Sequence, residues 1–402
     1  MRVKGFDKLQ HYYLDAVWRR IEDGKDVPAT LVEYASMSNG DADVEDFLVH
    51  LHRQLRDYPA VDPDHGKWRT WGFVVPFNGQ PVEYISNPLG EGVEEQHLAV
   101  YLPGTTAIIL CVEKRERVLP SSAINDKLFE RAKEMKEREE RELTRKDYAI
   151  LKDEVTAQLL KTAPVRRVRT YVMMDGTDLF VFTGSQKAAE ETNAIIRMAF
   201  SSFPTVPAYQ SEVLLQELFK KILRRDQDTL NHGSYVKLRN EEKEVVTVKD
   251  GDLDDERYTD MIDRGFTPIE LEFHCVSGVL NMDIWVKMNH KGDIKALSTA
   301  EDDDLTEDFH SQYEVGEAGY QSKIAELWVL HKVIANLTST MAGTGVMFDR
   351  QAQINSDTDT GDELDPEHGK KPEDEGDGAG DDALDQDATS DGETEDDDEW
   401  AI

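Results

Sequence analysis

The chain has 402 residues and a formal net charge of −36, with 82 Asp and Glu against 46 Lys and Arg. This length allows one large or two ordinary domains with a substantial hydrophobic core. The two cysteines, Cys111 and Cys275, offer neither a disulfide framework nor a zinc-ligand spacing, which favours a reducing cytoplasm. No apolar run reaches the roughly 18 residues of a membrane span, and the first residues lack a signal-peptide core. We therefore expect a cytoplasmic protein that does not enter a membrane.

In chain order, the first expected element is an amphipathic helix over residues 6–23, because apolar residues recur there at helical spacing. We assign residues 1–28 to an N-terminal helical extension. Alternating and aromatic-rich runs then predict strands, and Asp43 can cap a helix between them. These strands and the helix are expected at 29–37, 43–55, 68–75, 98–102 and 107–112. Together they predict an α+β part over residues 29–120.

Residues 121–163 are expected to form a projecting helical arm. Between Lys136 and Asp147 the only apolar residue is Leu143, so a helix there is polar on nearly every side and must lie in solvent. Pairs at helical spacing such as Glu137 and Arg141 would support it. The spacing of Thr144 and Asp147 is that of a capping box, which predicts a second helix that returns. The arm is either a solvated helix pair without a partner or a contact with a second copy or with DNA.

The rest of the chain is predicted in three parts. Residues 164–209 carry a hairpin turned at Asp175-Gly176, with Arg167 and Arg169 on one side of its first strand, and a helix over 185–199. Residues 210–345 contain a helix over 211–225 capped by Ser211, a final helix over 318–341, and strands between them. These strands are expected at 235–238, 245–248, 267–276, 279–288 and 294–297. The fold class is thus α+β, with mixed helices and antiparallel sheets.

The acidic residues are concentrated at the C-terminal end. Residues 351–402 hold 21 Asp and Glu and 2 Lys, a net charge of −19 that leaves −17 for the other 350 residues. This composition cannot form a core, so residues 346–402 are predicted to be a disordered acidic tail. Its ending, Trp400-Ala401-Ile402 after an acidic run, resembles the tails of single-stranded DNA-binding proteins. Partner docking, autoinhibition and simple solubilisation remain open for it.

Against this acidic background, residues 113–170 are net positive, with 16 Lys and Arg against 12 Asp and Glu. Local positive charge of this kind favours an anionic partner such as nucleic acid. A further cluster of Lys and Arg lies at the end of the helix over 211–225. It either binds an anionic partner or only complements the helix dipole. The candidate DNA-binding residues are Lys114, Arg115, Arg117, Arg166, Arg167, Arg169, Lys220, Lys221, Arg224, Arg225 and Lys249.

Motifs for catalysis, metal or cofactor binding are not recognisable. Residues 250–261 resemble a calcium loop but lack the glycine at its sixth position and the glutamate at its twelfth. Residues 301–304 are interpreted as a solvated acidic turn, and not as a nuclease metal site. We therefore expect no catalytic residues, no metal ligands, no cofactor and no enzyme activity.

Four motifs in register resemble the RdgC family, the recombination-associated DNA-binding proteins of bacteria. They are the segment 114–121, Leu151-Lys152-Asp153-Glu154-Val155, Lys187-Ala188-Ala189-Glu190 and Pro204-Thr205-Val206-Pro207. The resemblance implies a ring-like homodimer that encircles duplex DNA with little sequence preference and restrains RecA-promoted strand exchange. It also implies association with the nucleoid, and single-stranded DNA and a RecA-type recombinase as further partners.

Two other functions compete with this clamp. The net charge of −17 outside the tail favours an acidic DNA mimic or adaptor that binds a recombinase or nuclease directly. A metal-dependent nuclease is the third. The clustering of Lys and Arg at 114–117, 166–169 and 220–225 favours the clamp.

Overall fold

A computed structural model describes residues 5–348 of the chain, apart from gaps at 15–16, 23–24, 31–47, 49–50, 65, 82, 87–91, 201–202, 278–281, 300–302 and 314–316. The predicted tail began at residue 346, but Val346 and Met347 are buried in the main core and Met347 bridges Tyr209, so the start of that prediction is wrong. The rest of the predicted tail, from residue 349 on, lies outside the described residues. So do nearly all of the predicted strand over 29–37 and the start of the predicted helix over 43–55, although residues 51–56 are helical as expected. Residues 1–348 form one compact unit.

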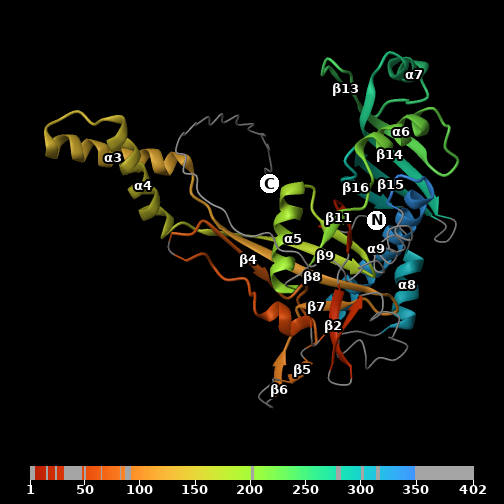
Figure 1. The fold of residues 1–402 in the computed structure, drawn as a ribbon, viewed down its shortest axis with the longest axis horizontal. Helices are drawn as coiled ribbons and strands as arrows, with labels where there is room; N and C mark the ends of the chain where they lie inside the picture. The colour runs from red at the N-terminus through yellow and green to blue at the C-terminus, as the bar shows by residue number, and fades with distance from the viewer. Residues whose placement is uncertain are drawn as a thin grey trace, which may run out of the picture. The chain divides into compact units, whose positions relative to one another are not determined.

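The larger sheet is antiparallel throughout and has seven strands (Figure 1). Its order is β11-β1-β10-β9-β8-β4, and β7 also pairs with β8. The strands are β1 Gln10–Leu14, β4 Arg69–Phe73, β7 Ala99–Tyr101, β8 Ala107–Arg117, β9 Val165–Asp175, β10 Asp178–Phe182 and β11 Thr205–Pro207. The predicted parts 1–28, 29–120 and 164–209 therefore all contribute strands to a single sheet.

The expected helix over residues 6–23 is wrong. Residues 10–14 form β1, which pairs with β10 on one side and β11 on the other, and β2 Val17–Glu22 pairs with β3 Lys25–Thr30. Phe6 and Leu9, each 1% exposed, belong to the main core, so this segment is not an extension. The apolar spacing was misleading because β1 is buried on both faces, and such a strand does not alternate.

The second sheet has five antiparallel strands in the order β13-β12-β14-β15-β16. They are β12 Asn231–Arg239, β13 Val245–Val248, β14 Thr267–Ser277, β15 Met282–Asn289 and β16 Ile294–Thr299. All five confirm the predicted strands. Buried and exposed residues alternate along β15, because one face of this sheet is packed and the other faces solvent.

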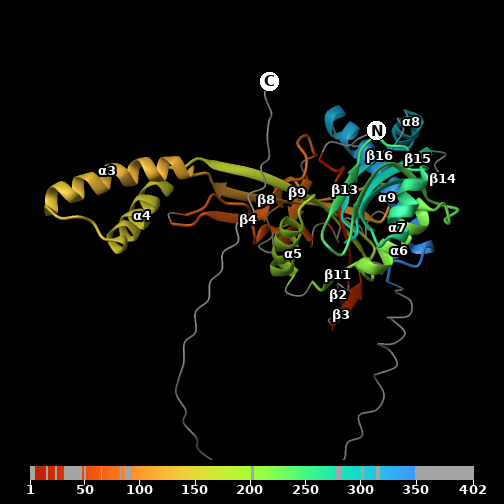
Figure 2. The ribbon, with the colours of Figure 1, turned by 90° about the horizontal axis from the view of Figure 1, so that it is seen from above.

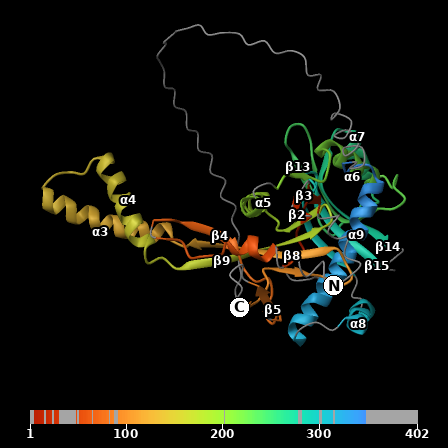
Figure 3. The same cartoon turned by 60° about the horizontal axis from the view of Figure 1, so that its bottom comes forward.

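Helices cover the packed face of the second sheet. Both α6 Glu212–Leu223 and α9 Ala318–Gly343 contact β14, and Figure 3 shows α9 beside these strands. The side chain of Ser211 caps α6 as predicted. Two further helices were not expected, α7 Glu256–Asp263 and α8 Asp303–Gln312. The second corrects the reading of 301–304 as a turn, because Asp303 and Asp304 begin α8.

The larger sheet is buried on both faces. One face joins the core shared with the second sheet, α6 and α9, through side chains such as Ile109 and Met173. The other face packs Leu110 and Val181 against α5 Gln186–Phe200 and the helical residues 51–56. The buried parts of β8 and β9 lie between these two layers, so packing on both faces holds the strands in place. Their charged ends lie beyond these layers.

The predicted arm is present as a helical hairpin of α3 Ser121–Glu139 and α4 Arg145–Leu160, which leads from β8 to β9 (Figure 2). Its helices pack on each other through Ala132, Leu151 and Val155. Thr144 and Asp147 form the predicted capping box, in which each side chain bonds the other's backbone N–H.

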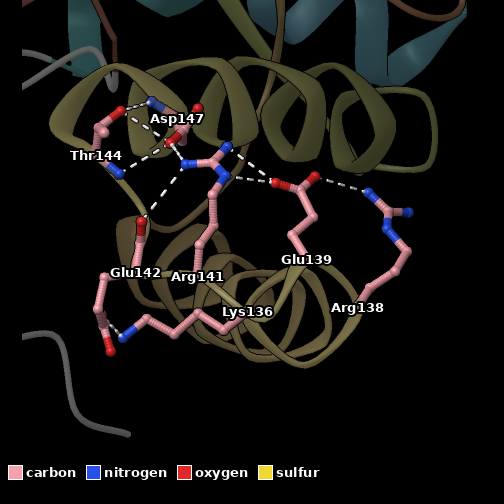
Figure 4. A network of polar contacts seen from close by, with 7 residues as sticks. All are labelled: Lys136, Arg138, Glu139, Arg141, Glu142, Thr144 and Asp147. Carbon is pink, nitrogen blue, oxygen red and sulfur yellow. Dashed lines mark hydrogen bonds and ion pairs between the residues drawn. The ribbon is translucent and has the colours of Figure 1, made fainter.

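A polar network closes the turn of the arm (Figure 4). Contrary to the expectation from helical spacing, Arg141 does not pair with Glu137. Its guanidinium contacts Glu139 at 2.9 Å and Asp147 at 2.7 Å, so it connects α3 to the first turn of α4. This arginine and the Thr144 bonds hold the pKa of Asp147 well below its usual range. The turn is therefore ordered by charge, although it contributes nothing to a hydrophobic core.

Candidate nucleic-acid interface

Two neighbouring strands bring six of the eleven predicted DNA-binding cations together. β8 passes from a buried stretch at 107–113 into a partly exposed charged end, and the first residues of β9 include Arg166, Arg167 and Arg169. Antiparallel pairing places these ends side by side, with Arg115 opposite Arg167 and Glu116 opposite Arg166. The six cations are Lys114, Arg115, Arg117, Arg166, Arg167 and Arg169.

The pleat divides these cations between the two faces of the sheet. Successive side chains on a strand point to opposite faces, and directly opposed residues share a face. Arg115, Arg117, Arg167 and Arg169 therefore share one face, which we call the arginine face. Lys114 and Arg166 lie on the other. The expectation that Arg167 and Arg169 share a side is confirmed, but the sequence analysis did not separate the six cations.

Glu113 is the central counter-charge of the arginine face. Its side chain is only 3% exposed, and it accepts hydrogen bonds from Arg115 Nε at 2.8 Å and from Arg169 Nε at 3.0 Å. Burial by itself raises the pKa of Glu113, but the bonds from Arg169 and Arg115 outweigh it, and the pKa is lowered. The carboxylate therefore stays ionised, and Arg115 and Arg169 are both held in structural ion pairs with it.

The other two arginines are less neutralised. Arg167 is 59% exposed, and its Nη2 lies 3.9 Å from the carboxylate of Asp62, which Arg115 already contacts at 2.9 Å. Arg117 donates to three neutral carbonyls, Pro63 O at 2.8 Å, Ala163 O at 3.1 Å and Lys161 O at 3.4 Å. Four guanidinium groups thus face two carboxylates, so the arginine face carries an excess of positive charge.

The opposite face is close to neutral. Glu116 accepts from Arg166 Nε at 2.9 Å and lies 3.2 Å from Lys114 Nζ. Burial raises the pKa of Glu116, but the bonds from Arg166 and Lys114 outweigh it and lower the pKa. Lys114 also lies 3.5 Å from Glu191 on α5, so Lys114 and Arg166 each have a carboxylate partner.

A cation that the sequence analysis missed extends this second face. Arg69 on β4 lies opposite Glu116 and is 5.2 Å from the ring of Trp71, while Lys114 is 5.8 Å from the same ring. Trp71, Lys114 and Glu116 line a cavity of about 130 Å³ against α5. Trp71 also packs on the smaller core. Arg69 and Trp71 are two positions apart in a predicted strand and therefore share a face. This spacing could have identified Arg69 as a candidate cation beside the tryptophan.

The cations of α6 are not part of the arginine face. This helix packs on the second sheet, and Lys249 directly follows β13 of that sheet. Three of its four cations pair with carboxylates: Lys220 with Glu217, Arg224 with Asp263, and Arg225 with Asp254. The pairing and the position at the helix end favour the helix-dipole explanation for this cluster.

Neither a metal site nor a membrane-spanning helix is found among the described residues. Within them, no group of three or more His, Cys, Asp or Glu side chains could hold a metal ion. None of the described helices has the length and hydropathy to cross a membrane.

Known proteins match this chain across the region just described. A family model described as "Putative exonuclease, RdgC" matches residues 87–342, a range that includes the arginine face, the arm and the second sheet. Relatives named recombination-associated protein RdgC match over different lengths. The one from Shewanella frigidimarina is 38% identical over 101 residues, which are 25% of this chain and 33% of that protein.

Longer matches have lower identity. The protein from Shewanella halifaxensis is 27% identical over 237 residues, 57% of this chain and 78% of the relative. The one from Haemophilus influenzae is 25% identical over 308 residues, 73% of this chain and 90% of the relative. The chain matches only a third of the length of the S. frigidimarina relative and of a second one from Shewanella denitrificans.

Proposed function

This chain belongs to the RdgC family, and on that premise we propose that it binds duplex DNA without sequence preference and modulates recombination. The observation that carries the proposal is the excess of guanidinium groups on the arginine face, in a chain whose net charge is −36. A positive surface in so acidic a protein indicates that this surface binds an anionic partner. The DNA backbone is a polyanion of this kind.

The chemistry of the arginine face suits phosphate better than base edges. A guanidinium group is planar, stays charged and can donate two parallel hydrogen bonds to a phosphate. Arg167 can do so because it is 59% exposed and its contact with Asp62 is long, at 3.9 Å, while Arg115 contacts the same carboxylate at 2.9 Å. Phosphate contacts position a protein on DNA but carry no sequence information. Binding at this face is therefore independent of sequence and strongly dependent on salt.

We further propose that two copies form a ring around the duplex, with the arm as one of two contacts between them. Phe129 on α3 is 75% exposed, and Ile150 on α4 is 49% exposed. Apolar side chains this exposed on an otherwise charged hairpin fit a surface that a second copy covers. The buried contacts of the hairpin use Ala132 and Leu151 instead, so Phe129 remains available for a partner.

A closed ring explains how such a protein acts in recombination and where it is found in the cell. Encircled duplex is less accessible to a RecA-type recombinase, so strand exchange is restrained without any catalytic step. Single-stranded DNA has the same phosphates and binds the same face. The cellular location that follows from this activity is the nucleoid.

Fluorescence anisotropy with a labelled duplex tests the proposal directly. The chain should bind a duplex and its scrambled counterpart with equal affinity, and added Mg²⁺ should leave the DNA intact. Closed circular DNA should retain the protein at salt concentrations at which linear DNA loses it, because a ring leaves only through an end. Equal release from both forms would contradict encirclement.

Two alternatives are outcomes of the same experiment. The charge of −17 outside residues 351–402 favours a DNA mimic, which would bind no DNA and would associate with a recombinase or nuclease instead. The description of the matching family model favours an exonuclease, which would shorten the labelled strand when Mg²⁺ is present. Either result would replace the clamp.

A further inference from the structure

The arginine face ends at an exposed aromatic residue that the proposed function does not use. Trp68, which directly precedes β4, is 45% exposed. Its carbonyl oxygen accepts from the backbone N–H of Arg117 at 2.8 Å, and Arg69 pairs with Glu116, so the pairing of β4 with β8 extends to Trp68. Directly opposed residues share a face of a sheet. Trp68 therefore lies on the same face as Arg117, at the edge of the arginine face.

The ring of Trp68 has no aromatic or cationic neighbour among the described residues. Trp71, in contrast, lies 5.2 Å and 5.8 Å from two cations. Trp285 on β15 is 37% exposed, but it is stacked on His274 with ring centroids 4.4 Å apart. A tryptophan ring is large and apolar, and it is normally mostly buried. The ring of Trp68 is therefore a surface that another flat ring can cover.

An apolar and a cationic side chain flank this tryptophan. Val61 is 54% exposed, and its carbonyl oxygen accepts from the hydroxyl of Thr70, which is two residues from Trp68 and shares its face. Lys67 directly precedes Trp68, is 65% exposed, and has only a long contact of 3.8 Å with Asp64. Apolar surface beside exposed positive charge suits a partner that is both aromatic and anionic.

The register of the sheet places Trp68 within reach of Arg167. Arg117 pairs with Val165, and Arg167 lies two residues further along β9, so Trp68 and Arg167 are two strand spacings and two residues apart. Strands about 4.8 Å apart with a rise of about 3.4 Å per residue place their Cα atoms roughly 12 Å apart. A base on the ring of Trp68 and a phosphate on Arg167 therefore belong to one short stretch of a strand.

We propose that Trp68 stacks on an unpaired base of single-stranded DNA while Arg167 binds a phosphate of the same strand. Every base has a π-face, so stacking on an aromatic ring beside cations binds single strands without sequence preference. In a duplex the bases are paired and stacked on one another, so Trp68 adds a contact that only single-stranded DNA makes. The inference rests on the proposed function, because it uses phosphate binding by the arginine face.

Fluorescence anisotropy of the full chain with three labelled ligands separates stacking from phosphate binding. The ligands are oligothymidine, an abasic deoxyribose-phosphate strand of the same length, and a duplex. Trp68→Ala should weaken oligothymidine binding by about fivefold or more, which is the contribution of stacking one base on an aromatic ring. Its binding of the abasic strand and of the duplex should not change, because neither presents an unpaired base. Trp68→Phe keeps an aromatic face and should restore most of the lost affinity.

Each contrary result has a distinct meaning. Unchanged oligothymidine affinity in Trp68→Ala, with duplex binding intact, would overturn the stacking contact and leave the proposed function standing. An unmodified chain that binds none of the three ligands would overturn the proposed function and this inference with it. The other cover for an exposed tryptophan is a second copy of the chain. A Trp68→Ala monomer beside a dimeric unmodified chain, measured by light scattering, would assign the ring to self-association and overturn stacking.

Trp285→Ala is the matched control, because Trp285 is an exposed tryptophan of the second sheet. It should bind all three ligands as the unmodified chain does. Tryptophan emission gives a second readout that keeps an aromatic side chain in place. Oligothymidine should quench the emission of the unmodified chain more strongly than that of Trp68→Phe, and equal quenching would contradict stacking. If Trp68→Ala fails to fold, this comparison decides.

Discussion

Arg169 and Glu113 lie directly opposite each other on β9 and β8, with Nε and Oε2 3.0 Å apart. The carboxylate is buried, and it also holds Arg115, whereas Arg167 on the same face lies 3.9 Å from its partner. The arginine face therefore contains two kinds of arginine. Those bound to Glu113 stabilise the sheet, and Arg167 is available for a ligand.

The Arg167→Ala variant should lose DNA affinity without losing stability. Removing one phosphate contact should reduce the log–log salt slope by about 0.9, and an exposed arginine contributes within about 0.5 kcal/mol to unfolding. Anisotropy between 50 and 200 mM salt measures the slope. Arg257→Ala is the matched control, because Arg257 is 71% exposed on α7. Equal slopes for the two variants would exclude Arg167 from the site.

The Arg169→Ala variant should behave in the opposite way. It leaves the buried Glu113 carboxylate with one arginine instead of two, which should destabilise the protein by about 1–3 kcal/mol. Urea denaturation measures this difference against the unmodified chain and against Arg167→Ala. An Arg169→Ala protein as stable as Arg167→Ala would show that the buried pair does not stabilise the sheet.

Glu113 should also make stability depend on pH in a defined direction. Its folded pKa is lowered by Arg169 and Arg115 against the effect of burial, so the ionised carboxylate stabilises the fold. This contribution is complete above the unfolded pKa of about 4.3 and disappears as pH falls through the folded pKa. The stability difference between the unmodified chain and Glu113→Gln should be constant from pH 6 to 8 and shrink below about pH 4. A difference that grows in acid would reverse the sign assigned to Glu113.

The Phe129→Glu variant should weaken self-association through the arm. A carboxylate at the most exposed aromatic of the hairpin cannot enter an apolar contact without a large desolvation cost. Light scattering at micromolar concentration should show dimers for the unmodified chain and monomers for the variant. Val213→Glu on α6 is the control, because Val213 is 65% exposed and outside the arm. A monomeric unmodified chain that still binds DNA fully would exclude the ring.

Deleting Asp357–Ile402 should tighten DNA binding, most strongly at low salt. The deleted residues lie outside the described part of the chain, and residues 351–402 carry a net charge of −19. Their composition predicts a flexible segment, and one of about fifty residues would span roughly 40 Å and compete with DNA for the same cations. Salt should weaken this competition, since the Debye length is about 8 Å at physiological ionic strength.

Deleting only Trp400–Ile402 is the matched control for the tail. It removes no acidic residue, so DNA affinity should not change, while an associated protein that docks on the apolar tip should be lost. Unchanged affinity after the large deletion at low salt would leave the tail a solubilising role only.

Much of the fold followed from local sequence patterns. Alternation over 267–288 predicted β14 and β15, and the polar stretch around Leu143 predicted the helical hairpin. The spacing of Thr144 and Asp147 predicted the start of α4 correctly. These features depend on residues a few positions apart, and their physical cause is therefore contained in a short segment of the chain.

The N-terminal strand and the division of the cations depended on distant partners. β1 lies between β10 and β11, so it is buried on both faces, and its residues show no alternation that would distinguish it from a helix. The sequence by itself determined that positive charge gathers at 113–117 and 165–169. Only the register of β8 on β9 decided that Glu113 holds Arg115 and Arg169 while Arg167 remains exposed, because pairing across a sheet is set by tertiary packing and not by neighbours in the chain.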